Sequence, residues 1–210
     1  MSTLLVKNSY TLVTMDDERR EIKNGAIFVR DNVVEQVGTS ETLPPTADKV
    51  LDLKGRHIVL PGLINTHHHF FQTLTRAVPA AQNCDLFHWL QTLYPIWSKL
   101  TDQGGSMSVG ESAGGLPPNA LVEKESDILK DSQRLIEQYH NNNRHAMTRL
   151  VLAPCSPFSV SPALMRESAA MARSYPGVRL HTHLAENKSD VDYSLSTFGL
   201  SPGDYAESVG

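Results

Sequence analysis

Short runs of β-branched and apolar residues occupy the first sixty positions, and turn-forming residues separate them. The runs lie at residues 10–14, 25–30, 33–37 and 57–60. Such residues suit a pleated, half-buried surface, and Asp31-Asn32 joins two of the runs across a gap short enough for a hairpin. We therefore predict that residues 1–60 form a small antiparallel sheet or the N-terminal part of a β-sandwich domain.

After Pro61-Gly62 apolar residues recur at intervals of three or four, the spacing of a helix rather than a strand. A helix is predicted over residues 85–100, with Asp85 as its N-cap and a kink at Pro95. Its apolar face consists of Leu86, Leu90, Leu93, Trp97 and Leu100. The chain beyond residue 60 therefore has a different organisation from the first segment.

A strand, a helix and a second strand follow one another in the last third of the chain. The apolar runs 150–153 and 178–184 predict the strands, and a Ser-Pro pair marks the start of a helix over 161–175. This order predicts a parallel sheet, because parallel strands need a crossover connection. A further helix is predicted over 126–140, with Ser126 as its cap.

Residues 101–125 fit neither pattern, because five glycines and Pro117-Pro118 interrupt any apolar periodicity. A structureless loop of that length is rare in a compact domain. Two interpretations stay open: the stretch is a lid, or it marks a point at which sequence is missing.

Composition argues against membrane, nucleic-acid-binding, disulfide-rich and secreted proteins. The 210 residues carry a formal net charge of −4, and no apolar run reaches the roughly 18 residues of a membrane helix. The mild acidity argues against nucleic-acid binding. Two cysteines, Cys84 and Cys155, cannot build a disulfide framework. The N-terminus has too few apolar residues before Lys7 for a signal peptide. We expect a cytoplasmic globular protein that binds neither membrane nor nucleic acid.

Five of the nine histidines stand in two clusters, each at the end of an apolar run. In the first, His67 and His69 lie two residues apart, so on a strand both would point to one face while His68 points to the other. Two imidazoles on one face can reach one divalent metal. A tag or surface histidines are the alternative, but the cluster is internal and follows a buried-looking run.

The second cluster, His181-Thr182-His183, is followed by Glu186. His183 is the expected third metal ligand, whereas His181 fits a hydrogen-bonded core residue better. A carboxylate beside a metal-activated water can accept its proton and deliver it to a leaving group, so Glu186 is the expected catalytic residue. The alternative for Glu186 is a helix-start acid that pairs with Lys188.

Imidazole ligands without cysteine favour zinc or a similar transition ion over magnesium or calcium. Three protein ligands leave one position for water, whose pKa falls to about 7, so such a site generates hydroxide at neutral pH. The histidines therefore predict hydrolytic attack on an electrophilic carbon.

The segment Pro61-Gly62-Leu63-Ile64-Asn65-Thr66-His67-His68-His69 resembles the first-strand signature of the amidohydrolase superfamily. The segment His183-Leu184-Ala185-Glu186 is similar to the fifth-strand histidine and catalytic glutamate of its deaminase branch. The resemblance implies an α/β fold: a (β/α)8 TIM-type metal-dependent hydrolase barrel over 61–210, partly represented, with a small β-sandwich domain over 1–60. It also implies one Zn²⁺, with Fe²⁺ as the other choice, because the fourth strand lacks the lysine that binuclear members carboxylate.

Four further segments, beginning at His69, Leu93, Gly114 and Ala153, are similar to bacterial 8-oxoguanine deaminases, which are relatives of guanine deaminase and the triazine hydrolases. The resemblance implies three substrate-binding residues: Gln72, Cys155 and Phe158. An amide at Gln72 can pair with a base edge, and Phe158 matches a pocket aromatic. Guanine deaminases carry an arginine just before that phenylalanine, where this chain has Cys155-Ser156-Pro157. A polar helix-start residue is the alternative for Gln72, and a small buried filler for Cys155.

The chain departs from the family pattern in length. A (β/α)8 barrel takes about 250 residues, so residues 61–210 suffice for about five of its eight units. Strands are missing near 103/104 and after 210, and with them the sixth-strand histidine and the eighth-strand aspartate that the family uses. We expect that these 210 residues alone neither close a barrel nor turn over substrate. We also expect a partial record of a longer enzyme rather than a truncated relic.

The sequence thus predicts a zinc-dependent aminohydrolase that converts an oxidised purine, 8-oxoguanine, to urate and ammonia. A triazine or pterin aminohydrolase of the same superfamily is one alternative. The other is a non-catalytic metal-binding fragment, or a partial barrel that acts only with a partner chain. A homo-oligomer is expected from the family alone.

Overall fold

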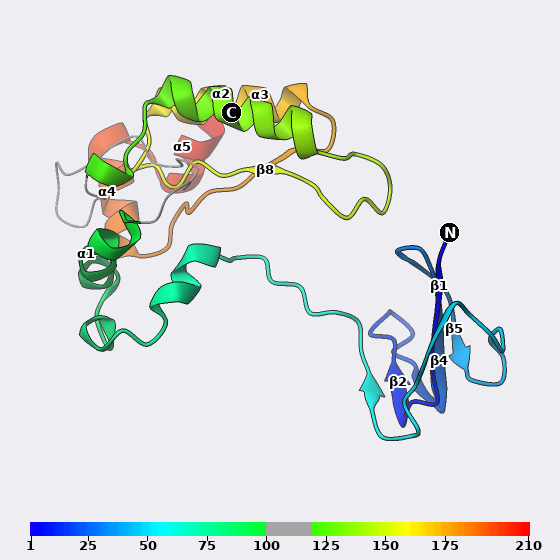
Figure 1. Cartoon of the computed structure of the whole chain (residues 1–210). Helices are drawn as coiled ribbons and strands as arrows, with labels where there is room; N and C mark the ends of the chain where they lie inside the picture. Colours follow the sequence, from blue (N-terminus) through cyan, green and yellow to red (C-terminus); the bar gives the residue numbers. More distant parts are fainter. Residues whose placement is uncertain (100–118) are drawn as a thin grey trace. The chain divides into compact units, whose positions relative to one another are not determined.

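The computed structural model describes residues 1–99 and 119–210 (Figure 1). The chain separates into two compact units, residues 1–68 and 69–210, and each is described by itself. The expectation of missing strands near residues 103/104, and that of a lid over most of 101–125, lie outside the described residues.

Unit 1 is built from two small sheets. The first contains β1 (Thr3–Lys7), β4 (Gly25–Arg30), β5 (Val33–Thr39) and β6 (Lys49–Asp52), in the order β5-β4-β1-β6; the second contains β2 (Thr11–Val13), β3 (Glu21–Lys23) and β7 (Ile58–Val59), in the order β3-β2-β7. Leu5, Ala26, Phe28 and Leu43 form a buried apolar cluster. The predicted hairpin at Asp31 is confirmed, because β4 and β5 pair on either side of it.

The expectation of a purely antiparallel sheet is wrong, because each sheet of unit 1 contains one parallel pair. β1 pairs with β6 and β2 pairs with β7 in parallel register. In each parallel pair, other strands lie between the two partners along the chain, and this intervening chain brings the second partner back in the same direction as the first. The sheets of unit 1 are therefore mixed.

The strand expected just before His67 does not form. Residues 60–69, all of which the structure describes, contain no helix or strand, and the side chains of Leu63 and Ile64 are 98% and 88% exposed. A strand needs a neighbour for its backbone hydrogen bonds, and none of the described strands pairs with this segment. The apolar residues 60–64 therefore follow β7 and lead to the histidines without forming a strand.

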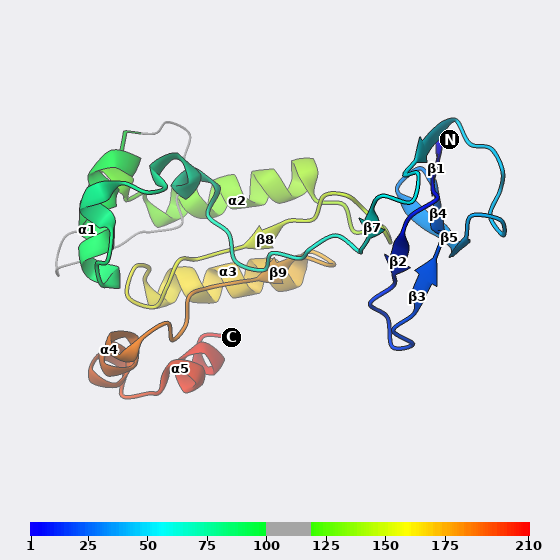
Figure 2. The same ribbon diagram turned by 90° about the horizontal axis from the view of Figure 1, so that it is seen from below.

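Unit 2 consists of helices and one two-stranded sheet (Figures 1 and 2). The helices are α1 (Leu86–Trp97), α2 (Glu125–Tyr139), α3 (Pro162–Ser174), α4 (Lys188–Phe198) and α5 (Pro202–Ser208), with 3₁₀ turns η1 (Phe70–Thr75), η2 (Pro79–Ala81) and η3 (Asn119–Leu121); the strands are β8 (Val151–Leu152) and β9 (Arg179–Leu180). Among the described helices, none has the length and hydropathy that crossing a bilayer requires.

The predicted starts of α1 and α3 are confirmed. The Asp85 carboxylate accepts a hydrogen bond from the backbone N–H of His88 at 3.0 Å, and the Ser161 hydroxyl accepts one from Leu164 at 3.1 Å. The prediction that Ser126 caps α2 is wrong, because α2 begins at Glu125 and makes no side-chain cap bond. Two acidic residues in its first turn favour the helix start through the helix dipole instead.

The strand–helix–strand unit is confirmed: β8 and β9 pair in parallel, and α3 connects them. One face of the pair packs on α2 and α3 through an apolar cluster of Ile136, Leu152, Ala172 and Val178. On the pair itself, Val151 and Leu180 are 48% and 41% exposed. Two strands do not close a barrel, so the described residues show part of the expected architecture and not a barrel.

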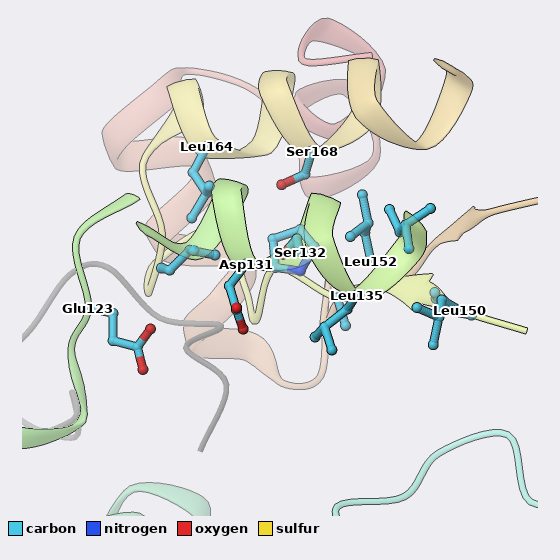
Figure 3. Close-up of a pocket in the computed structure, with 13 residues that line it drawn as sticks. Glu123, Asp131, Ser132, Leu135, Leu150, Leu152, Leu164 and Ser168 are labelled. Atoms are coloured by element: carbon cyan, nitrogen blue, oxygen red, sulfur yellow. The ribbon is translucent and has the colours of Figure 1, made fainter. Parts of the chain in front are cut away.

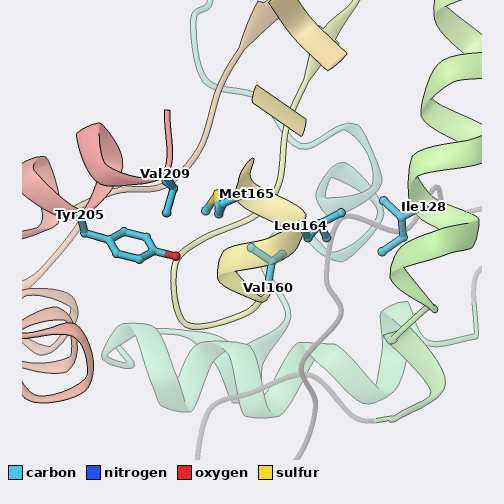
Figure 4. Close-up of a cluster of buried hydrophobic side chains, with 6 residues drawn as sticks. All are labelled: Ile128, Val160, Leu164, Met165, Tyr205 and Val209. Carbon is cyan, nitrogen blue, oxygen red and sulfur yellow. The ribbon is translucent and has the colours of Figure 1, made fainter. Parts of the chain in front are cut away.

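A second apolar cluster joins α2, α3 and α5 (Figure 4). It consists of Ile128, Val160, Leu164, Met165, Tyr205 and Val209. Leu164 is 1% exposed and lies in the first turn of α3, so its side chain is among the most deeply buried in unit 2.

We predict that Leu164→Ala lowers the free energy of unfolding by about 2–5 kcal/mol, because the substitution removes buried methyl groups and leaves a cavity. Urea denaturation followed by far-ultraviolet circular dichroism measures this change. Leu195→Ala is the matched control: Leu195 lies on α4 and is 51% exposed, so its truncation should cost less than about 0.5 kcal/mol. Equal losses in the two variants would contradict the prediction.

Candidate metal centre

His69 and His183 lie side by side although 114 residues separate them along the chain. Their Nε2 atoms are 3.2 Å apart, and the two rings stack with centroids 5.1 Å apart and an angle of 12° between their planes. His69 is the residue just before η1, and His183 follows β9. The start of η1 and the end of β9 thus bring two imidazole nitrogens to one point.

The backbone carbonyl of Cys155 fixes the ring of His183. This carbonyl accepts a hydrogen bond from the backbone N–H of His183 at 2.9 Å and lies 2.8 Å from its ring Nδ1. The bonds extend the parallel pairing of β8 and β9, in which His181 N–H donates to the Leu152 carbonyl. A hydrogen on Nδ1 leaves the lone pair on Nε2, the nitrogen that faces His69. Metal-binding histidines are typically held in this tautomer.

His67 completes a group of three. The ligand nitrogens of His67, His69 and His183 all lie within 4.8 Å of one another. His67 is exposed, whereas the other two are half-buried. The backbone N–H of His67 donates to the Asn65 side chain at 3.1 Å, which holds the turn before His69. Within unit 2, the fold thus brings together two of the three histidines predicted as ligands, His69 and His183.

The geometry of this group fits a zinc ion. Two nitrogens that each lie about 2.0–2.1 Å from a tetrahedral zinc are about 3.3 Å apart, close to the 3.2 Å found between His69 and His183. An all-imidazole donor set also suits zinc better than a hard cation. The residues present thus match a zinc site in ligand type, in tautomer and in spacing.

Hydrogen bonding raises the pKa of His183 to about 9. The Cys155 side chain is the largest cause; burial opposes the rise, while the Cys155 carbonyl and the charges of Cys155 and Glu186 add to it. The Cys155 Sγ lies 3.9 Å from His183 Nδ1. Below that pH the metal-free ring is charged, so a metal ion that binds Nε2 has to displace a proton.

Glu186 lies in the turn between β9 and α4, with an exposed side chain. Its backbone N–H donates to Asp190 Oδ2 at 2.8 Å, and the same oxygen accepts from Asn187 N–H at 3.1 Å. Asp190 is 6% exposed and forms a capping box with Asn187 at the start of α4. The capping box fixes the backbone of Glu186 and leaves its carboxylate accessible from solvent. Neither Asn187 nor Asp190 is among the residues predicted from the sequence, although an Asn followed three residues later by an acid is a capping signal.

The three predicted substrate residues occupy different positions. Gln72 is half-buried in η1, and Cys155 is half-buried beside His183. The Phe158 ring packs edge-on against Tyr193 of α4, with centroids 6.2 Å apart. His181, interpreted from the sequence as a core histidine, is instead exposed.

A cavity of about 210 Å³ opens elsewhere in unit 2, between α2, β8 and α3 (Figure 3). Its walls are mainly apolar, with Leu150, Leu152 and Leu164 among them. Glu123 and Asp131 provide the carboxylates at its edge. None of the predicted metal-binding, catalytic or substrate residues lines it, so we do not assign the predicted chemistry to this cavity.

Residues 97–210 match the amidohydrolase family. The chain is 36% identical over 263 residues to an 8-oxoguanine deaminase of Pseudomonas aeruginosa, a match that covers 100% of the chain and 58% of the relative.

Two solved structures have a fold similar to that of this chain. A triazine hydrolase of Arthrobacter aurescens is 25% identical with a TM-score of 0.85, and the match covers 100% of this chain and 58% of the other. An atrazine chlorohydrolase of Arthrobacter aurescens TC1 complexed with zinc is 24% identical with a TM-score of 0.81; 99% of this chain and 58% of that chain are covered. The chain thus spans less than two thirds of the length of these proteins.

Proposed function

Because the chain belongs to the amidohydrolase family, we propose that it carries histidine ligands of the metal centre of a zinc-dependent aminohydrolase acting on an oxidised purine, 8-oxoguanine. The observation that supports this most is the convergence of His69 and His183, with the ring of His183 fixed by the Cys155 carbonyl. A histidine whose Nδ1 is bonded to a carbonyl, and whose Nε2 faces a second histidine, is oriented as a ligand.

His67, His69 and His183 would hold the ion. When bound, zinc supplies hydroxide from water at neutral pH. Glu186 is the group that moves protons: its carboxylate accepts one from water and delivers it to the ring nitrogen beside the amino-bearing carbon, which makes that carbon more electrophilic. The oxygen of the deprotonated water would add to that carbon, its remaining proton would pass to the amino group, and ammonia would leave as the C–N bond breaks and the carbonyl forms.

Three residues would bind the heterocycle. The amide of Gln72 offers both a donor and an acceptor to a base edge, and Phe158 offers an apolar ring face. Cys155 is the third candidate, since its Sγ lies within 3.9 Å of the His183 ring. Water exclusion would come from the apolar ring at Phe158, which α4 supports through Tyr193.

The substrate assignment rests on the relatives. The most extensive support is the 8-oxoguanine deaminase, which is 36% identical across the whole chain. The structural similarity to a triazine hydrolase favours a second candidate, an aminohydrolase that acts on a triazine ring. In both substrates the amino group is on a ring carbon that is flanked by nitrogens, so the same metal centre and the same proton transfer would serve either.

The proposal is tested on the native protein, with its intact mass measured first. Ammonia release is then followed with 8-oxoguanine, guanine and an amino-triazine as substrates. We expect 8-oxoguanine to give the highest kcat/KM. Faster turnover of the triazine supports the second candidate. Zinc binding without ammonia release from any of the three, in a protein of 23.2 kDa, leaves the metal-binding fragment as the function.

Removal of the metal should abolish ammonia release. We expect dialysis against a chelator to reduce activity to background, and addition of Zn²⁺ to restore it, because the histidines cannot generate hydroxide at neutral pH without the ion. Inductively coupled plasma mass spectrometry measures the metal content alongside the activity. Calcium or magnesium should not restore activity, since neither prefers imidazole ligands; activity that survives complete metal removal would contradict the proposal.

A further inference from the structure

A buried hydrogen bond joins Trp97, in the last turn of α1, to Thr75, at the end of η1. The indole Nε1–H donates to Thr75 Oγ1 at 3.0 Å. The two residues are 2% and 8% exposed. A buried indole N–H needs an acceptor, so this bond fixes the hydroxyl of Thr75 relative to α1. Neither residue takes part in the proposed reaction.

Two further hydrogen bonds continue from Thr75 to His69. The Thr75 hydroxyl donates to the backbone carbonyl of Gln72 at 3.1 Å. The backbone N–H of Gln72 donates to the carbonyl of His69 at 3.1 Å. Three successive bonds therefore run from Trp97 to the backbone of a candidate metal ligand, and they pass through the backbone of a candidate substrate residue.

An aromatic contact reaches the side chain of His69 from the same indole. The Phe71 ring meets the Trp97 ring edge-on, with centroids 5.0 Å apart and an angle of 82°. The Phe71 ring also contacts the His69 ring, with centroids 6.0 Å apart and an angle of 64° between the planes. Trp97 thus supports both the backbone and the imidazole of His69.

This external support matters because η1 is a weak element by itself. It has six residues, and no side chain caps its start at His69. A 3₁₀ turn has poorer hydrogen-bond geometry than an α-helix and rarely persists unaided. A metal ligand at its first residue needs a fixed backbone, since outer contacts that orient ligands commonly determine metal affinity tenfold to a hundredfold.

We propose that Trp97 and Thr75 are positioning residues for the metal centre. They hold η1 so that the imidazole of His69 meets that of His183, and so that Gln72 keeps its position in η1. This inference rests on the proposed function and deepens it. The competing explanation is that Trp97 only fills the apolar cluster of α1, which also contains Ala81, Leu93 and Tyr94.

The test compares variants that separate the hydrogen bond from the packing. Thr75→Val keeps the volume and removes the hydroxyl, whereas Thr75→Ser keeps the hydroxyl. Trp97→Phe removes the indole N–H. Trp89→Phe is the matched control: Trp89 lies on the same helix and its ring packs on Trp97 at 5.3 Å, but its indole is not bonded to Thr75.

Cobalt binding by the native protein, followed through the visible absorption of Co²⁺, gives the affinity and the ligand geometry. We expect Thr75→Val and Trp97→Phe to bind cobalt about tenfold more weakly, with a changed absorption band. The double variant should bind cobalt no more weakly than the weaker-binding single variant, because both substitutions break the same hydrogen bond between Trp97 and Thr75. Thr75→Ser and Trp89→Phe should bind within about twofold of wild type.

Wild-type affinity in both Thr75→Val and Trp97→Phe overturns the proposal, and so does an equal loss in Trp89→Phe. If the wild-type protein itself binds no cobalt, the metal centre of the proposed function fails, and amide hydrogen exchange over residues 70–75 then tests the positioning by itself. Faster exchange in Thr75→Val than in Trp89→Phe supports it, and equal exchange overturns it.

Discussion

In the native protein, Glu186→Gln should reduce ammonia release by a factor of about 10²–10⁴ while the metal content stays unchanged. Glutamine keeps the size and the hydrogen-bonding capacity of the side chain but can neither accept nor deliver a proton at neutral pH. Glu186 is also one of the charges that raise the pKa of His183, so its carboxylate acts on the histidine group. Steady-state kinetics with 8-oxoguanine, together with metal analysis of the purified variant, measure both effects.

The control for Glu186→Gln is Asp192→Asn, which removes a carboxylate six residues further along the chain. Asp192 is exposed on α4 and pairs with Lys188 at 2.6 Å. An exposed pair of this kind contributes little to stability, so the variant should keep both its turnover and its metal. Full turnover in Glu186→Gln would remove Glu186 from the proton transfer, and loss of metal in that variant would make it a ligand instead.

The second large effect is expected on zinc affinity, when a candidate histidine ligand is removed. His183→Ala should weaken zinc affinity by more than the tenfold to hundredfold that the loss of an outer contact causes. Ammonia release should fall with the metal content. The substitution removes one of the two nitrogens that lie 3.2 Å apart and also ends the bond between Nδ1 and the Cys155 carbonyl. Zinc titration against a competing chromophoric chelator measures the affinity.

His181→Ala is the matched control, because it removes the same side chain two residues earlier in the same segment. His181 is exposed and is absent from the group of three histidines. We expect its zinc affinity to stay within about twofold of wild type. Equal losses at His181 and His183 would mean that the segment, rather than one imidazole, holds the ion.

The local elements of this protein follow from its sequence. Asp85 and Ser161 predict two helix starts correctly, since a cap acts on backbone groups two or three residues away. The runs at 150–153 and 178–184 predict two parallel strands, because the intervening helix provides the crossover connection that parallel pairing needs. Sequence pattern alone did not reveal α4 and α5, whose apolar residues are few, although Asn187 and Ser201 provide cap signals.

The pairing of strands that lie far apart in the sequence could not be predicted from local sequence patterns. The apolar residues 60–64, before His67, have the local sequence pattern of a strand. They form none, because none of the described strands pairs with them. Likewise, the parallel pairing of β6 with β1 and of β7 with β2 joins segments that lie far apart in the sequence. A strand is defined by its neighbour, so its formation depends on contacts that one segment of sequence does not contain.

The same division holds for the metal centre. The sequence by itself predicted the type of ligand, imidazole, from the spacing of His67 and His69 and from the four residues from His183 to Glu186. Only the tertiary structure decided that His183 meets His69, that a carbonyl of Cys155 sets its tautomer, and that Trp97 and Thr75 hold η1. These contacts join residues 22 to 114 positions apart. Chemical identity is a property of each residue, whereas mutual orientation arises only when separate elements pack together.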